Sequence, residues 1–169
     1  MSPRVREESL HPRFQSGVSG RPLKRGVRFP VNPYRYVASL RLRHPSIDLA
    51  EATVRFGLPP TRFWKSGTPR TTPTGEALSG IYSESYWTAP LLGGAKVLST
   101  DVSLEDSLAG VLIQVAPHRE FLAAIRDSAG SCECFVGLFA SANFGIELSA
   151  TLMRGFSDVG LDLAIDAYP

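Results

Sequence analysis

Residues 58–70 (LPPTRFWKSGTPR) combine basic and aromatic side chains with three prolines directly after a predicted short helix. The basic and aromatic members of this segment are Arg62, Phe63, Trp64, Lys65 and Arg70. Arginine and tryptophan are among the residues that most often dominate protein interfaces. No nucleophile with a base and no set of metal ligands accompanies them. The segment therefore predicts a contact surface and not a reaction centre.

The next extended segment adds a second group of candidate partner-binding residues: Tyr82, Glu84, Tyr86 and Trp87. On one strand, Glu84 would share a face with both tyrosines, where a carboxylate is typical of a solvated cross-strand partner. Neighbouring side chains of an extended segment point to opposite faces. We therefore expect one ring of Phe63 and Trp64 to lie in the core. We expect Trp64 to be at least partly exposed, because its indole N–H needs a hydrogen-bond partner.

Catalysis has little support in the sequence. The chain contains no G-x-S-x-G, no phosphate-binding loop, no H-E-x-x-H and no G-x-G-x-x-G. His118 at a predicted helix start could act as a base, but a surface histidine in the first turn is the favoured explanation. Asp101, Glu105 and Asp106 fit the positive end of a helix dipole. We expect no catalytic residue and no cofactor, and an unrecognised enzyme is our third hypothesis.

The two cysteines are too few for a disulfide framework. Cys132 and Cys134 could supply half of a zinc site, but no second pair exists and the three histidines lack ligand spacing. We therefore expect reduced thiols and no metal. Reduced cysteines, the lack of a long apolar run and the lack of an apolar signal core predict a cytoplasmic protein with no membrane partner.

Charge is distributed unevenly along the chain. Residues 1–35 contain eight Lys or Arg against two Glu, a net +6, which leaves −4 for residues 36–169 out of the total of +2. Residues 1–33 are rich in Arg, Ser, Gly and Pro and show no periodicity, which predicts a basic flexible leader before one domain at 34–169. A basic leader is the only part of the chain that suggests a polyanion.

Periodicity and capping residues predict a mixed set of elements. Strands are expected over residues 37–43, 62–65, 78–87, 132–140 and 161–167, and residues 145–148 are a candidate for a further short strand. Helices are expected from Asp48 to about residue 56, from Ser103, from Pro117 to Gly130, and from Ser149 to Gly160. For the first helix, Asp48 with Glu51 resembles a capping box, and Ile47 is placed to pack on Ala52. Residues 66–73 are expected to form a loop.

This order predicts an α+β fold: a two-layer sandwich with a mainly antiparallel sheet and helices on one face, ferredoxin-like or related. Alternating strands with one wetter face favour that arrangement over a parallel sheet. We expect the first and last strands to be neighbours, because Arg41 and Arg43 on one would face Asp162 and Asp166 on the other.

Several segments carry a family resemblance: FGLPPTRFWKSGTPR, SLEDSLAGVL, SCECFVGLFA, ELSATLMRGFSDVGLDL and LAIDAY. In their order and spacing, residues 35–168 resemble the bacterial domain of unknown function 4279 family. The resemblance implies a small cytoplasmic α+β domain with no assigned enzymatic activity. It implies no catalytic residues.

The hypothesis that fits most of these observations is a noncatalytic partner-binding domain, an immunity-like or inhibitor protein that binds another protein. The alternative is nucleic-acid contact through the basic leader. The leader residues that would make this contact are Arg21, Lys24, Arg25 and Arg28.

Overall fold

The computed structural model describes residues 32–169. Its strands are β1 (Arg35–His44), β2 (Arg62–Trp64), β3 (Pro69–Thr71), β4 (Ala77–Ile81), β5 (Ser85–Pro90), β6 (Val97–Leu98), β7 (Ser131–Phe139) and β8 (Asp162–Tyr168). Its helices are α1 (Glu51–Phe56), α2 (Leu104–Val115), α3 (Arg119–Asp127) and α4 (Ala150–Val159), with short 3-10 turns η1 (Leu92–Gly94) and η2 (Ala116–His118).

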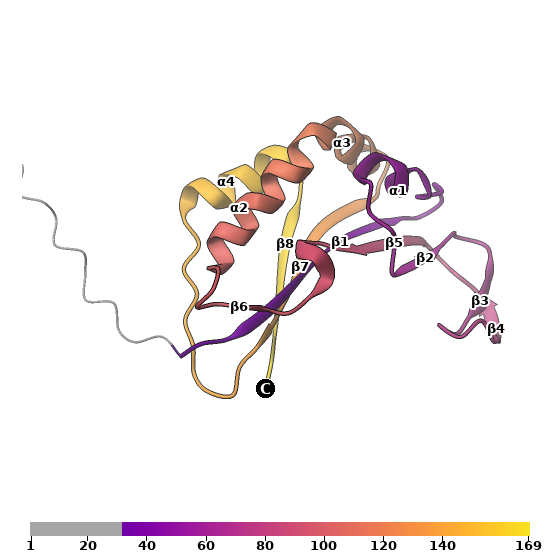
Figure 1. The fold of residues 1–169 in the computed structure, drawn as a ribbon. Helices are drawn as coiled ribbons and strands as arrows, with labels where there is room; N and C mark the ends of the chain where they lie inside the picture. Colours follow the sequence, from indigo (N-terminus) through magenta and orange to yellow (C-terminus); the bar gives the residue numbers. More distant parts are fainter. Residues whose placement is uncertain (1–31) are drawn as a thin grey trace, which may run out of the picture.

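The main sheet has the strand order β2-β5-β1-β7-β8, and β6 pairs with the start of β1. All neighbours are antiparallel except β7 and β8, which are parallel. The helices cover one face of this sheet and leave the other face open (Figure 1). The order β2-β5-β1-β7, with α1 and then α2 and α3 between strands, is that of a ferredoxin-like fold. The predicted α+β class with a mainly antiparallel sheet is confirmed.

The central strand β1 alternates between the two faces as predicted. Tyr36, Ala38, Leu40 and Leu42 are buried on the helix side. Leu42 lies in register between Trp87 of β5 and Cys132 of β7, and all three side chains are fully buried. Burial of a large apolar side chain stabilises a fold by about 1.5–3 kcal/mol. This row is therefore the centre of the core.

Serine caps position two of the covering helices. Ser103 Oγ accepts a hydrogen bond from the Asp106 amide at 3.0 Å at the start of α2. Ser149 Oγ accepts one from the Leu152 amide at 3.2 Å at the start of α4. Both starts are as predicted, because a serine at this position satisfies an amide that has no partner within the helix.

The start of α1 differs from the prediction. The helix begins at Glu51 with Ala50 as its N-cap, and no side chain caps it. Asp48 Oδ1 instead accepts from the Ala50 amide at 2.9 Å, which closes an Asx turn before the helix. Ile47 is 46% exposed, so it makes no hydrophobic staple. The predicted capping box and staple are therefore wrong.

Residues 78–87 are not one strand. They belong to β4, which among residues 32–169 pairs only with β3, and to β5, which lies in the main sheet. Gly80 has φ +86 within β4, and Tyr82 to Glu84 connect the two strands. A period-two pattern does not show where a chain changes its partner strand. The loop predicted over 66–73 consequently contains β3, and residues 145–148 form no strand.

The first and last strands are not neighbours, because β7 lies between β1 and β8. The predicted pairing of Arg41 and Arg43 with Asp162 and Asp166 is therefore wrong. The chain returns through α4 after β7, and such a crossover places the next strand parallel to and beside the one before it. Strand β8 consequently pairs with β7 and not with β1.

His44 joins the end of β1 to α3. Its Nδ1 accepts hydrogen bonds from the amides of Ser46 and Ile47 at 3.0 and 2.8 Å. The ring proton therefore lies on Nε2, which donates to Ser128 Oγ at 3.2 Å. Ser128 in turn donates to the Ala124 carbonyl at 2.6 Å. This chain of hydrogen bonds, which starts at the buried His44, holds the helix layer against the end of the central strand.

The stretch Leu104–Asp127 is long and apolar enough to cross a membrane by length and composition alone. In the fold it is broken by η2, which contains Pro117. Leu108, Val111 and Leu122 from this stretch are buried against the sheet. These three apolar residues thus have a role in the core.

Gly130 follows α3 where any side chain would collide with backbone. A Cβ there would lie 2.7 Å from the carbonyl oxygens of both Arg43 and Ile125. We expect Gly130→Ala to lower the free energy of unfolding by about 1–3 kcal/mol through overpacking. The matched control is Gly110→Ala in α2, where no atom lies within 4 Å of the new Cβ. It should raise stability by about 0.5–1 kcal/mol. Urea unfolding measures both, and equal effects would contradict this account.

Candidate interaction surface

The chain that leaves α1 places β2 at the edge of the sheet. Gly57 ends α1 in the left-handed conformation (φ +63), and two prolines prevent the helix from continuing. In register, Arg62 pairs with Thr88, and Trp64 pairs with Tyr86 of β5. Arg62 and Trp64 therefore lie on the helix-free face of the sheet, and Phe63 points to the other side.

Trp64 lies between two tyrosine rings. Its ring centroid is 4.7 Å from that of Tyr82, with an interplanar angle of 13°, and 4.5 Å from that of Tyr86. The Tyr82 hydroxyl donates to the Thr71 carbonyl of β3 at 3.1 Å. Aromatic pairs of this kind contribute about 0.5–1.5 kcal/mol beyond the area they bury. The stack thus fastens the β3–β4 hairpin to the main sheet.

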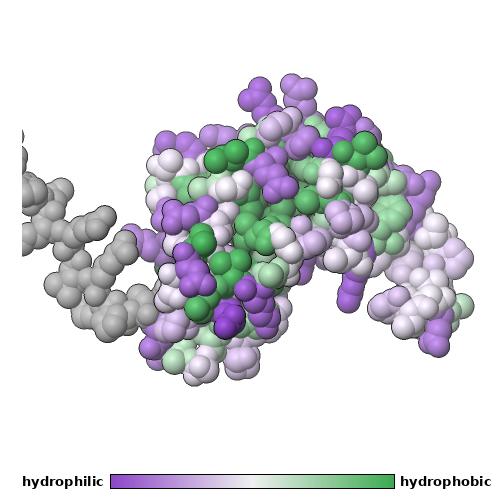
Figure 2. Space-filling model, in the orientation of Figure 1, coloured by the Kyte–Doolittle hydropathy of each residue, from purple (hydrophilic) through white to green (hydrophobic). Residues whose placement is uncertain are grey.

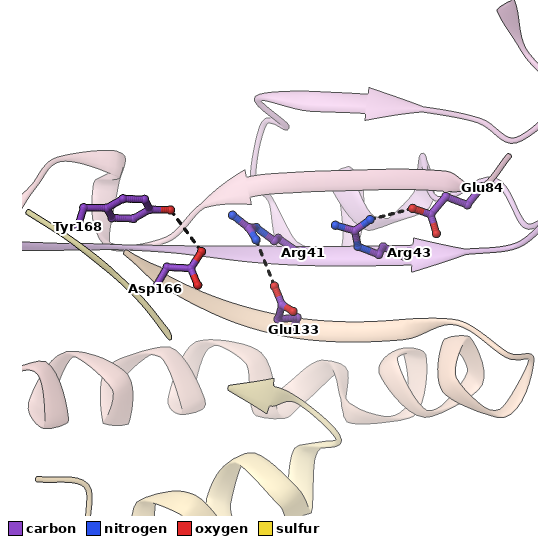
Figure 3. Close-up of polar contacts among 6 residues, drawn as sticks. All are labelled: Arg41, Arg43, Glu84, Glu133, Asp166 and Tyr168. Atoms are coloured by element: carbon purple, nitrogen blue, oxygen red, sulfur yellow. Dashed lines mark hydrogen bonds and ion pairs between the residues drawn. The ribbon is translucent and has the colours of Figure 1, made fainter. Parts of the chain in front are cut away.

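The stack continues onto β1 through Arg43. The guanidinium carbon of Arg43 lies 4.9 Å from the centre of the Tyr86 ring. Its Nη1 donates to Glu84 Oε1 at 2.7 Å (Figure 3). Glu84 lies in the connection between β4 and β5 and serves as the cross-strand partner that its position suggested.

Trp64 is partly exposed, as expected, but Phe63 is not a core residue. Phe63 is 43% exposed, so the expectation that one of these two rings fills the core is wrong. Its register partner Trp87 occupies the core at this end of the sheet. A three-residue strand at the sheet edge leaves Phe63 without a covering helix.

Trp87 does not belong to the contact surface. Its side chain is fully buried, and its Nε1 donates to Thr53 Oγ1 of α1 at 3.0 Å. Its ring also packs 6.0 Å from that of Phe56. The prediction of Trp87 as a partner-binding residue is therefore wrong. Neighbouring residues on a strand point to opposite faces, so Tyr86 on the helix-free face could have shown that Trp87 points toward the helices.

A hollow of about 490 Å³ lies between β2 and the hairpin. Its lining includes Arg62, Phe63, Trp64, Arg70, Leu78 and Tyr82. Lys65 points elsewhere and pairs with Asp48 at 3.6 Å. Within residues 32–169, neither Arg62 nor Arg70 makes an ion pair or a side-chain hydrogen bond. Five of the predicted contact residues thus line one hollow.

The rest of the helix-free face carries cations over aromatic rings, which the sequence reasoning missed. The Arg41 guanidinium lies 3.3 Å from the centre of the Phe135 ring and pairs with Glu133 at 3.3 Å (Figure 3). Lys96 Nζ lies 3.6 Å over Phe139, whose ring stacks 5.2 Å from that of Tyr168. The period-two pattern of residues 131–139 is the sequence signal that could have predicted which of their side chains lie on this face.

The polar groups that could have been catalytic have structural partners. The His118 ring meets Phe56 edge-on at 4.8 Å. Glu105 Oε1 accepts from the Ser149 amide at 3.1 Å, and Asp106 Oδ2 accepts from Ser103 Oγ at 2.6 Å. Within residues 32–169, no group of three or more His, Cys, Asp or Glu could hold a metal ion.

The surface consists of an open antiparallel sheet face with a hairpin fastened to its edge, and the helices lie on the opposite side. These features define a small two-layer α+β domain. The sequence profile described as domain of unknown function (DUF4279) matches residues 32–169, and the chain belongs to this family. No curated protein and no solved structure matches the chain. The leader residues Arg21, Lys24, Arg25 and Arg28 lie outside the described part.

The two tryptophans should report different environments. In a Trp87→Phe variant, emission from Trp64 should be quenched readily by iodide, because this ring lies at the surface. In the matched Trp64→Phe variant, emission from the buried Trp87 should be blue-shifted and resist quenching. Trp87→Ala should cost about 3–5 kcal/mol of stability, and Trp64→Ala clearly less. Emission from Trp64 that iodide cannot reach would contradict this assignment.

The buried thiols should make stability depend on alkaline pH. Burial raises the pKa of Cys132 and that of Cys134 from 9 to about 12. The unfolded chain therefore loses these protons above pH 9 while the folded chain keeps them. The free energy of unfolding should be unaffected by the thiols below pH 9 and fall as the pH rises from 9 toward 12.

Urea unfolding at pH 8 and pH 10.5 measures this loss. A Cys132→Ala/Cys134→Ala variant is the control, because it should lose less stability between the two pH values. At pH 8 the native thiols should react with a thiol reagent only after denaturant is added. Rapid labelling of the folded protein would show that the thiols are accessible.

Proposed function

We propose that this domain is a noncatalytic binding module that recognises another protein through β2 and the β3–β4 hairpin. The observation that supports this most directly is the hairpin itself. It projects from the body of the domain and all of its strand residues are exposed (Figures 1 and 2). Two of its apolar side chains, Leu78 and Ile81, are 44% and 63% exposed. An isolated two-stranded hairpin is only marginally stable in water.

The way in which the hairpin is held supports a role as a contact arm. The Tyr82–Trp64–Tyr86 stack and the Tyr82 hydroxyl position it against the sheet edge. Pre-positioning lowers the entropic cost of binding. The exposed aromatic, apolar and arginine side chains around it match the composition of the central part of protein interfaces.

An immunity-like or inhibitory role is consistent with this surface, because an inhibitor needs a complementary surface and no catalytic group of its own. The location that we propose is the cytoplasm. Its support is that both cysteines are free and buried, which suits a reducing compartment.

Nucleic-acid contact through the basic leader is the competing proposal. Residues 32–169 contain 11 Lys or Arg and 14 Asp or Glu, a net charge of −3, so this contact would depend on the leader. Such binding would weaken steeply with salt.

A capture experiment with a matched control separates the proposals. The full chain, a Leu78→Ser/Ile81→Ser variant and a Val54→Ser/Ile113→Ser variant are immobilised and exposed to the same cell extract, with and without nuclease. Val54 and Ile113 are 84% and 78% exposed on α1 and α2, so the control removes similar apolar surface elsewhere. We expect a protein that the wild type and the control retain and that the hairpin variant binds at least about tenfold more weakly.

The outcomes of this experiment are distinct. Equal retention by the hairpin variant would overturn the proposal. Loss of the captured protein after nuclease treatment, or after deletion of residues 1–31, would favour nucleic-acid contact through the leader. A thermal melt of each variant checks that the substitutions leave the fold intact.

A further inference from the structure

Arg62 and Arg70 are the two cations of the contact surface that the fold leaves without a partner among residues 32–169. The neighbouring cations Lys65, Arg43 and Arg41 each pair with a carboxylate, at 3.6, 2.7 and 3.3 Å. Arg62 lies on β2 and Arg70 on β3, and both side chains line the hollow between these strands. The hollow therefore has an unneutralised cation on each of its two sides.

Apolar groups line the hollow together with these two arginines. Phe63, Trp64 and Leu78 line the same hollow, and Phe63 and Leu78 are 43% and 44% exposed. The lining also contains threonines, so the hollow combines apolar, polar and charged groups and can accept one bulky side chain and orient it through ion pairs.

The open edge of β2 favours an extended conformation in a segment that binds to the hollow. Within residues 32–169, β2 pairs with β5 on one side only, so its other edge is open toward the hairpin. Extended segments bind to open strand edges through their main chain, and the side chains that alternate along them provide specificity.

We propose that this hollow binds an extended segment of the partner protein in which two acidic residues flank a bulky apolar side chain. The carboxylates pair with Arg62 and Arg70, and the apolar side chain lies against Phe63 and Leu78. This inference rests on the proposed function, and it specifies the chemistry of the partner.

Charge argues against other occupants. The leader of this chain, residues 1–31, contains seven Lys or Arg against two Glu, so the arginines repel it. A second copy paired edge to edge would bring Arg62 and Arg70 of both copies together. Nucleic acid requires a row of cations along its phosphates. The hollow has only two cations, Arg62 and Arg70. Two carboxylates, Glu76 and Glu84, lie in the same region of the chain and reduce its positive charge.

A display library of short random peptides tests the proposal on the full chain. Peptides selected on the wild type should be enriched in Asp or Glu on either side of an apolar residue. Binding of a selected peptide, measured by fluorescence anisotropy, should weaken at least about tenfold in Arg62→Glu/Arg70→Glu. It should be unchanged in Arg119→Glu/Arg154→Glu, which changes the net charge equally at exposed positions on α3 and α4. Changing the acidic residues of the peptide to Lys should restore binding to the Arg62→Glu/Arg70→Glu variant.

Four results would overturn the inference: selection of basic or purely apolar peptides, an equal loss in the control variant, tighter binding of an oligothymidylate than of any peptide at the same arginines, or self-association that Arg62→Glu/Arg70→Glu abolishes.

Failure here is distinguishable from failure of the proposed function. If the captured partner still depends on Leu78 and Ile81 but binds the Arg62→Glu/Arg70→Glu variant normally, the proposed function stands and only the acidic segment is excluded.

Discussion

The alternation of β1 is the constraint on which the rest of the structure depends. Tyr36, Ala38, Leu40 and Leu42 are buried beneath the helices, and the intervening residues face the open side. A shift of one residue would exchange the two sets, so burial on one face sets the register of both neighbouring strands. β5 and β7 pair with β1 in that register. The positions of the aromatic and charged groups on the open face follow from it.

A sheet face without helices must cover its apolar groups in another way. Here three cations lie over aromatic rings: Arg41 over Phe135, Arg43 over Tyr86 and Lys96 over Phe139. Cations over ring faces are favourable contacts, and the side-chain stems shield apolar surface from water. Arg41, Arg43 and Lys96 are thus engaged within the domain itself. The region around β2 and the hairpin is different, since its arginines and Phe63 remain available for contact.

Elements whose signal is local were predicted well from the sequence. β1, α2, α4 and β8 were expected close to where they lie, because alternation, a helical stripe and a serine cap each depend on residues near in the chain. Of the residues predicted to form a contact surface, Arg62, Trp64, Arg70 and Tyr82 line one hollow. The division of residues 78–87 was missed, and so was the inward position of Trp87. Both depend on which strand, distant in the sequence, pairs with this segment, and the local composition does not indicate that.

The sequence by itself determined the α+β class, the helix ends marked by Ser103, Ser149 and Gly160, and the basic-aromatic character of residues 62–70. These follow from backbone preferences and hydrogen bonds within a few residues. Only the tertiary structure decided that β7 lies between β1 and β8, that Arg41 and Arg43 pair with Glu133 and Glu84, and that Arg62 and Arg70 remain unpaired within residues 32–169. Ion pairs between distant segments depend on strand order. That order results from burying all of the apolar faces at once, which no single segment specifies.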